Sequence, residues 1–150
     1  MRWNASYLRS LILLAVVICG ATLVFGGNSP SERIQWHADL GEAWKTTCES
    51  GRPLLLFVTV ENCGYCTKMK NGTFTDAAVV STISEAFVPT WINRRELKQM
   101  VDQLQIRLFP TTLIILPDCR VADRINGYVN AQTLQARLGV IDGKTHHQLR

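Results

Sequence analysis

Apolar and polar positions divide the chain into stretches of helix and strand length. Residues 54–60 (LLLFVTV) form a continuous apolar run, partly β-branched, which predicts a strand buried on both faces. Before this run, residues 40–49 carry apolar side chains at helical spacing, and the helix ends at Gly51 and Pro53. The pattern therefore predicts a domain that opens with a helix followed by a central strand.

The pattern continues to residue 138. Short helical turns are expected over residues 67–70, and longer helices over residues 76–85, 96–104 and 131–138. Further strands are expected over residues 87–92, 111–116 and 121–125, and Pro89 suits the start of a strand or an edge strand. Two parallel strands joined by a helix, then an antiparallel hairpin and a closing helix, predict an α/β fold with a central mixed sheet flanked by helices.

The N-terminal region has the layout of an export segment. Residues 1–10 contain Arg2 and Arg9 and no acidic residue, and residues 11–25 are uncharged and almost wholly apolar. This apolar stretch is shorter than the ~20 residues that span a bilayer comfortably, which favours a cleaved signal. A clear small-residue cleavage site is lacking, which favours a retained membrane anchor, so both alternatives stay open. In either case we expect the remainder to lie outside the cytoplasm, in a periplasm or secreted.

Besides this N-terminal segment, the composition allows one globular domain. The 150 residues are 47% hydrophobic and 19% charged, enough for a single core. We expect a signal or anchor over residues 1–27, a linker over 28–35, the domain over 36–140 and a tail over 141–150. The net charge of +4 is spread along the chain without dense basic runs, which argues against nucleic-acid binding.

The motif Cys63-Gly64-Tyr65-Cys66 begins three residues after the predicted central strand, where a helix should start. A thiol attacks a disulfide as the thiolate, and the amide groups at a helix N-terminus lower the pKa that controls this form. One helical turn separates the cysteines, so they can close a short, reducible ring. We interpret Cys63 as the nucleophile and Cys66 as the resolving thiol; a static structural disulfide is the alternative.

Three features together resemble the thioredoxin superfamily over residues 36–138: the C-x-x-C motif after an apolar strand, the sequence Phe-Pro-Thr-Thr at residues 109–112, and Gly127 after the second hairpin strand. The sequence Thr-Phe-Thr-Asp at residues 73–76 is most similar to small exported thioredoxin-like proteins and to the C-terminal domain of DsbD-type thiol:disulfide reductases. The resemblance implies that Pro110 is cis and lies beside the cysteines. It also implies that Phe109, Pro110 and Tyr65 contact the substrate chain.

Two positions depart from the thioredoxin pattern. Phe57 stands where thioredoxins have a buried aspartate that assists proton transfer, and Asn62 stands where they have a tryptophan. Glu61 lies nearer the motif, and we expect it to be a solvated side chain, the alternative being that it replaces the aspartate. These differences argue against disulfide reduction as fast as that of thioredoxins. They do not argue against disulfide exchange by the two cysteines.

Two further cysteines fall at the end of the predicted sheet opposite Cys63. Cys48 precedes the central strand and Cys119 lies in the hairpin turn, so they are candidates for a second, structural disulfide, the alternative being two separate buried thiols. No second C-x-x-C or H-x-x-x-H pattern exists, so the sequence predicts no structural zinc site.

The sequence thus predicts an exported thiol:disulfide oxidoreductase that acts on cysteines of other extracytoplasmic proteins and needs no dissociable cofactor. A redox partner, such as a membrane reductase, would recharge the dithiol. Two alternatives stay open: cuprous-ion binding by Cys63 and Cys66, whose soft thiolates suit that ion, and a redox-inert binding module that uses the groove beside Pro110. Reduction, oxidation and isomerisation would use the same residues, so the sequence does not determine the direction.

Overall fold

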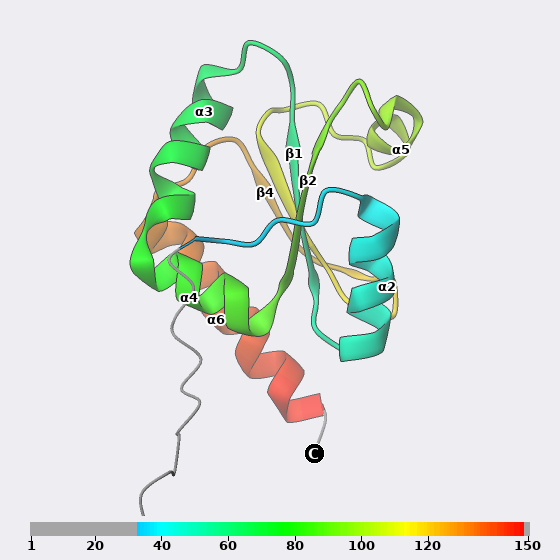
Figure 1. The fold of residues 1–150 in the computed structure, drawn as a ribbon, viewed down its shortest axis with the longest axis vertical. Helices are drawn as coiled ribbons and strands as arrows, with labels where there is room; N and C mark the ends of the chain where they lie inside the picture. The colour runs from blue at the N-terminus through cyan, green and yellow to red at the C-terminus, as the bar shows by residue number, and fades with distance from the viewer. Residues whose placement is uncertain (1–32, 149–150) are drawn as a thin grey trace, which may run out of the picture.

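The computed structural model of this protein describes residues 33–148, which form one mixed sheet with helices on both faces (Figure 1). The strand order is β2-β1-β3-β4. The strands are β1 (Leu54–Thr59), β2 (Val88–Asn93), β3 (Thr111–Ile115) and β4 (Val121–Asn126). β1 is parallel to β2 and antiparallel to β3, and β3 is antiparallel to β4. The predicted α/β topology is confirmed, whereas the predicted export segment lies outside the described residues.

The central strand β1 is buried on both faces, as its apolar sequence predicts. All six of its side chains are at most 3% exposed. Leu55 and Phe57 belong to the core cluster on one face, while Leu54, Leu56 and Val58 belong to the cluster on the other. The first face is covered by α3 (Gly64–Asn71), α4 (Ala77–Ala86) and α6 (Ala131–Gln148), and the second by α2 (Leu40–Ser50) and α5 (Lys98–Gln103). β1 therefore links both layers of the core.

Side-chain caps fix where two of the helices begin. The Asp39 carboxylate accepts a hydrogen bond from the Glu42 N–H (2.9 Å) at the start of α2, and Asp76 accepts from two backbone N–H groups at the start of α4. Gly51 ends α2 with a φ of +72°, a left-handed conformation that glycine adopts without steric cost. These local signals explain why α2 and α4 match their predicted bounds closely.

The edge strand β2 accommodates Pro89, as predicted for an edge. Residues just before α2 cover its outer side: the His37 N–H donates to the Pro89 carbonyl (2.9 Å), and the Thr90 hydroxyl donates to the His37 carbonyl (3.0 Å). Ile34, only 7% exposed, packs into the core beneath α3. The packed domain thus begins before residue 36 and includes the end of the predicted linker.

Two helices differ in length from the prediction. α5 begins at Lys98 rather than residue 96, because Leu97 has non-helical dihedrals (φ −129°, ψ 48°). α6 continues to Gln148 instead of ending at residue 138, so most of the predicted tail is helical. The apolar stripe of α6 continues from Leu138 to the buried Ile141, which explains why Gly139 does not end the helix.

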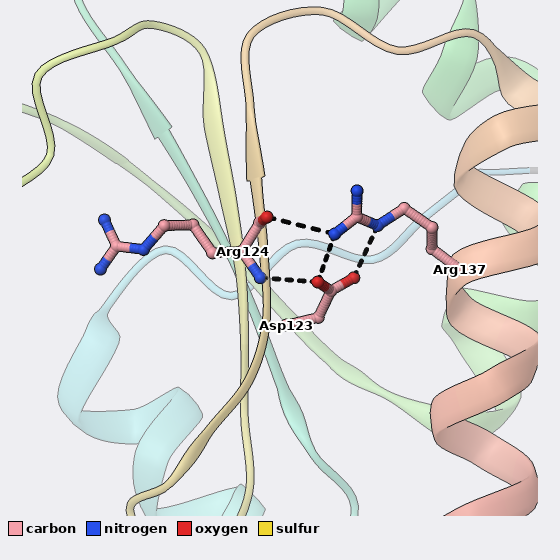
Figure 2. Close-up of polar contacts among 3 residues, drawn as sticks. All are labelled: Asp123, Arg124 and Arg137. Atoms are coloured by element: carbon pink, nitrogen blue, oxygen red, sulfur yellow. Dashed lines mark hydrogen bonds and ion pairs between the residues drawn. The ribbon is translucent and has the colours of Figure 1, made fainter.

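An ion pair joins α6 to the edge strand β4 (Figure 2). Arg137 donates from Nε to Asp123 Oδ2 (2.7 Å) and from Nη2 to Asp123 Oδ1, and Nη2 also donates to the Arg124 carbonyl (3.2 Å). This charge-assisted pairing raises the pKa of Arg137 above its usual value. The Asp123 side chain is 20% exposed and that of Arg137 is 40% exposed, so the pair that attaches the closing helix to the sheet is partly shielded from solvent.

We predict that Arg137→Met lowers the free energy of unfolding by about 1–2 kcal/mol, because it leaves the shielded Asp123 carboxylate without its bidentate partner. Urea unfolding of the full-length protein, followed by circular dichroism, measures this change. Arg120→Met is the matched control, since Arg120 pairs with Asp118 where both side chains are more than half exposed. Equal losses in the two variants would contradict a specific role for the α6–β4 pair.

Candidate active site

The motif cysteines lie at the junction of β1 and α3. After β1 the chain turns through Asn62, whose φ is +53°, and Cys63 is the N-cap of α3. Cys63 and Cys66 form a disulfide with an S–S distance of 2.02 Å, and the Cys66 N–H donates to Cys63 Sγ (3.1 Å). The sequence therefore places one sulfur directly at the amide end of a helix.

The two sulfurs differ in their access to solvent. Cys63 is half-buried, whereas Cys66 is 4% exposed and packs into the core beside Met69. In the reduced state, the N-terminal amides and dipole of α3 stabilise a thiolate on Cys63. Cys63 Sγ is therefore accessible to a sulfur of another molecule. Cys66 Sγ can reach Cys63 Sγ only from the protein interior.

The predicted substrate-contact residues gather at the same end of the sheet. The Phe109–Pro110 peptide bond is cis, as the family resemblance implies. Thr111 pairs with Val58, so the cis proline meets the sheet next to the end of β1, and the Pro110 carbonyl accepts a hydrogen bond from the Gly127 N–H (2.7 Å). Phe109 is half-buried and packs against both core clusters.

Tyr65, between the cysteines, projects into solvent and is 64% exposed. Its ring centroid lies 6.1 Å from that of Tyr128, which follows β4. Lys68 Nζ lies 4.7 Å from the Tyr128 ring centroid. Sequence reasoning identified Tyr65 but missed Tyr128 and Lys68, because only the fold brings the segment after β4 alongside α3.

An open depression of about 600 Å³ lies beside the disulfide. Its walls include Cys63, Cys66, Lys70, Trp91 and Asn93. Lys70 Nζ lies 3.7 Å from the Trp91 ring centroid, and partial burial lowers the pKa of this lysine. Sequence reasoning missed Lys70, although its spacing offered a signal: it follows Cys66 by four residues and so shares the same face of α3.

The walls of this depression contain no carboxylate among the described residues. Phe57, at the position of the thioredoxin aspartate, is fully buried, with its ring centroid 6.3 Å from Trp36 and 4.9 Å from Phe74. Glu61 instead forms an exposed ion pair with Arg95 (2.5 Å). The aromatic cluster thus occupies the place where thioredoxins carry a proton-transfer group.

Cys48 and Cys119, candidates for a second disulfide or for two buried thiols, form no disulfide in this structure and are not buried, because both are free and exposed thiols. Their location is as expected, because the start of β1 pairs with the end of β3 at the pole away from Cys63. However, α2 turns Ala43 and Thr47 toward the core, which leaves Cys48 facing solvent, and Cys119 lies at the tip of the hairpin turn with a φ of +67°. The two thiols therefore do not meet.

Within residues 33–148, no group of three or more His, Cys, Asp and Glu side chains gathers closely enough to hold a metal ion. For a soft ion such as cuprous ion, the described part of the site offers the two thiolates of the reduced motif as ligands. The same part of the chain contains no helix that is long and apolar enough to cross a membrane.

The profile of the Thioredoxin-like domain family matches residues 40–141, which include the motif, the cis proline and all four strands. The chain belongs to the thioredoxin-like family. This membership, together with the disulfide-forming C-x-x-C pair, supports the predicted thiol:disulfide oxidoreductase activity. A search of curated proteins found no significant match.

Solved structures of other thioredoxin-like proteins share the fold at low sequence identity. A thioredoxin from Thermus thermophilus aligns with a TM-score of 0.66 at 18% identity, covering 72% of this chain and 86% of that one. The DsbH oxidoreductase aligns at 0.63 and 16% identity, covering 81% and 94%. The reduced DsbD C-terminal domain from Neisseria meningitidis aligns at 0.59 and 16% identity, covering 67% and 91%.

The difference in burial predicts a difference in alkylation of the thioredoxin-like site. After reduction of the full-length protein, iodoacetamide should modify Cys63 at least about tenfold faster than the buried Cys66, as resolved by peptide mass spectrometry. Without reduction, Cys48 and Cys119 should react while the motif cysteines stay protected. Equal rates at the two motif cysteines, or protection of Cys48 and Cys119, would contradict the described geometry.

Proposed function

We propose that this protein is an extracytoplasmic thiol:disulfide oxidoreductase that exchanges disulfides with protein substrates through Cys63 and Cys66. One observation carries the proposal: a closed disulfide at the N-terminus of α3, with a half-exposed first sulfur and a buried second sulfur. A purely structural disulfide gains little from a position where helix amides favour the thiolate. The family membership supports the same chemistry.

In the reductive direction, the Cys63 thiolate attacks one sulfur of a substrate disulfide, forms a mixed disulfide and releases the other substrate sulfur as a thiolate. The Cys66 thiolate then attacks Cys63 Sγ, closes the intramolecular disulfide and releases the second substrate thiol. Two electrons pass from the protein to the substrate. The reverse sequence oxidises a substrate dithiol, so the reduction potential and the recharging partner set the direction.

The substrate chain would lie against the backbone beside Pro110, with Phe109 and Tyr65 as apolar contacts. These residues flank the end of β1 that leads to Cys63, and Tyr65 is largely exposed. Exposed aromatic rings around a reactive sulfur suit an extended peptide that carries apolar side chains next to its cysteine.

We place this activity outside the cytoplasm, in a periplasm or secreted, with residues 11–25 acting as a cleaved signal or a membrane anchor. The support is the basic start followed by an apolar, uncharged stretch in the sequence. Stable use of a dithiol there requires a redox partner, and the structural similarity to DsbH and to the DsbD C-terminal domain supports thiol-redox partner proteins in general. We propose a membrane reductase in that role. Other extracytoplasmic proteins with cysteines would be the substrates.

Equilibration with glutathione tests the central proposal. We expect the full-length protein to interconvert between dithiol and disulfide across glutathione ratios, with loss of this transition in Cys63→Ser and retention in a Cys48→Ser, Cys119→Ser variant. Maleimide mass-tagging counts the free thiols. A potential well below the glutathione couple indicates a reductant, and one well above it indicates an oxidant or isomerase.

If Cys63 and Cys66 never pair reversibly, the oxidoreductase proposal fails. Cuprous-ion binding by the two thiolates and a redox-inert binding role would then be the explanations of the site to test. Titration with cuprous ion in wild type and in a Cys63→Ser, Cys66→Ser variant separates these two explanations.

A further inference from the structure

Basic residues concentrate at the disulfide end of the molecule. The segments that leave or enter the sheet at this end are residues 60–72, 94–110 and 127–130, because β1, β2 and β4 end there and β3 begins there. These segments hold three acidic residues and six basic ones: Lys68, Lys70, Arg94, Arg95, Lys98 and Arg107. The rest of residues 33–148 holds seven basic and eight acidic residues. The positive charge of the domain is therefore directed toward the active site.

Internal contacts leave three of these cations, Lys68, Lys70 and Arg107, without a carboxylate partner among the described residues, and the two lysines lie on α3 with the motif. The three acidic residues are engaged: Glu61 pairs with Arg95, Asp102 with both Lys98 (2.9 Å) and Arg94 (3.4 Å), and Glu96 accepts from the Asn93 N–H (3.4 Å). Lys68 and Lys70 have no carboxylate partner in the part of the chain that the structure describes. They are the uncompensated charges next to the disulfide.

Aromatic rings hold both lysines at the site. Lys68 lies over Tyr128, whose ring neighbours Tyr65 of the motif, and Lys70 lies over Trp91 in the depression that Cys63 and Cys66 line. A ring below an ammonium group restricts its position without neutralising its charge. Lys70 is only partly buried, so its ammonium group is accessible to a carboxylate that enters the open depression.

We propose that two lysine–aromatic pairs on different sides of α3, Lys68 with Tyr128 and Lys70 with Trp91, act with Tyr65 as a recognition surface for protein segments that carry carboxylate side chains beside the reacting cysteine. This inference rests on the proposed function and specifies its substrate class. The aromatic rings contact the apolar part of the segment, and Lys68 and Lys70 pair with its acidic side chains. Because the disulfide lines the depression that holds Lys70 and Trp91, and Tyr65 belongs to its motif, we infer that the occupant is a polypeptide with a cysteine rather than another polyanion.

The test compares three peptides that differ only in charge. Each contains one intramolecular disulfide flanked by Glu, Ser or Lys pairs, and the reduced full-length protein reduces each by the two-step exchange described above. Rates are divided by those with dithiothreitol, a small thiol reductant without lysine or aromatic side chains, to remove intrinsic differences in reactivity. We expect kcat/KM to fall in the order Glu, Ser, Lys, with about fivefold or more between Glu and Ser at low ionic strength and a smaller ratio in 0.5 M salt.

Charge variants locate the effect. Lys68→Glu combined with Lys70→Glu should invert the preference toward the Lys-flanked peptide, and Lys70→Met alone should lower the Glu-to-Ser ratio. Lys45→Glu, an exposed change on α2 across the sheet, is the matched control and should keep the wild-type ratio. Circular dichroism verifies that each variant is folded, and the salt dependence of the wild type tests the same charge effect without any substitution.

The outcomes separate the two proposals. If the wild type reduces the Ser-flanked peptide but the Glu-to-Ser ratio is near one, the charge preference is overturned while the oxidoreductase function stands. If no peptide is reduced, the proposed function fails, and this inference fails with it. If a single-stranded oligonucleotide competes as well as a cysteine-free Glu-flanked peptide, the surface binds polyanions in general and the preference for acidic polypeptides is overturned.

Discussion

The double burial of β1 is the constraint on which the rest of the structure depends. Its side chains enter both core layers, so a one-residue shift in register would move each set of side chains into the layer packed for the other set. The strand in turn fixes the start of α3 and thus the position of Cys63. Pairing with β2 and β3 brings the segments that carry Trp91 and Pro110 to the same end. The active site is therefore assembled around the most deeply buried strand of the sheet.

Features that arise from local sequence could be predicted. The apolar run of β1, the Asp76 cap of α4 and the glycine that ends α2 each act within a few residues, so the fold and the motif position follow from them. Features that depend on contacts between elements far apart in the sequence could not be predicted. The continuation of α6 past Gly139 depends on the burial of Ile141, and the free state of Cys48 depends on which face α2 presents to the sheet.

The lysine–aromatic pairs are another example of this limit. Along the chain the basic residues look dispersed, because they come from segments separated by whole strands and helices. Only the strand order shows that Tyr128 meets α3 and that Trp91 lies below Lys70. The site also differs in electrostatic character from that of thioredoxins, since the ionisable neighbour of the disulfide in the depression is a cation and the carboxylate position is aromatic. A nearby cation favours the thiolate form of a cysteine.

The residues that make the core and those that surround the disulfide are largely separate sets. Phe57, Met69 and Leu55 have no exposed surface, whereas Lys68 and Tyr65 lie on the outside of α3 and contribute little to the core. Substitutions at the outer positions can therefore change the recognition surface without changing the packing that positions Cys63. A chain built this way can change its substrate proteins through a few surface substitutions, because the core that positions the cysteines is not altered.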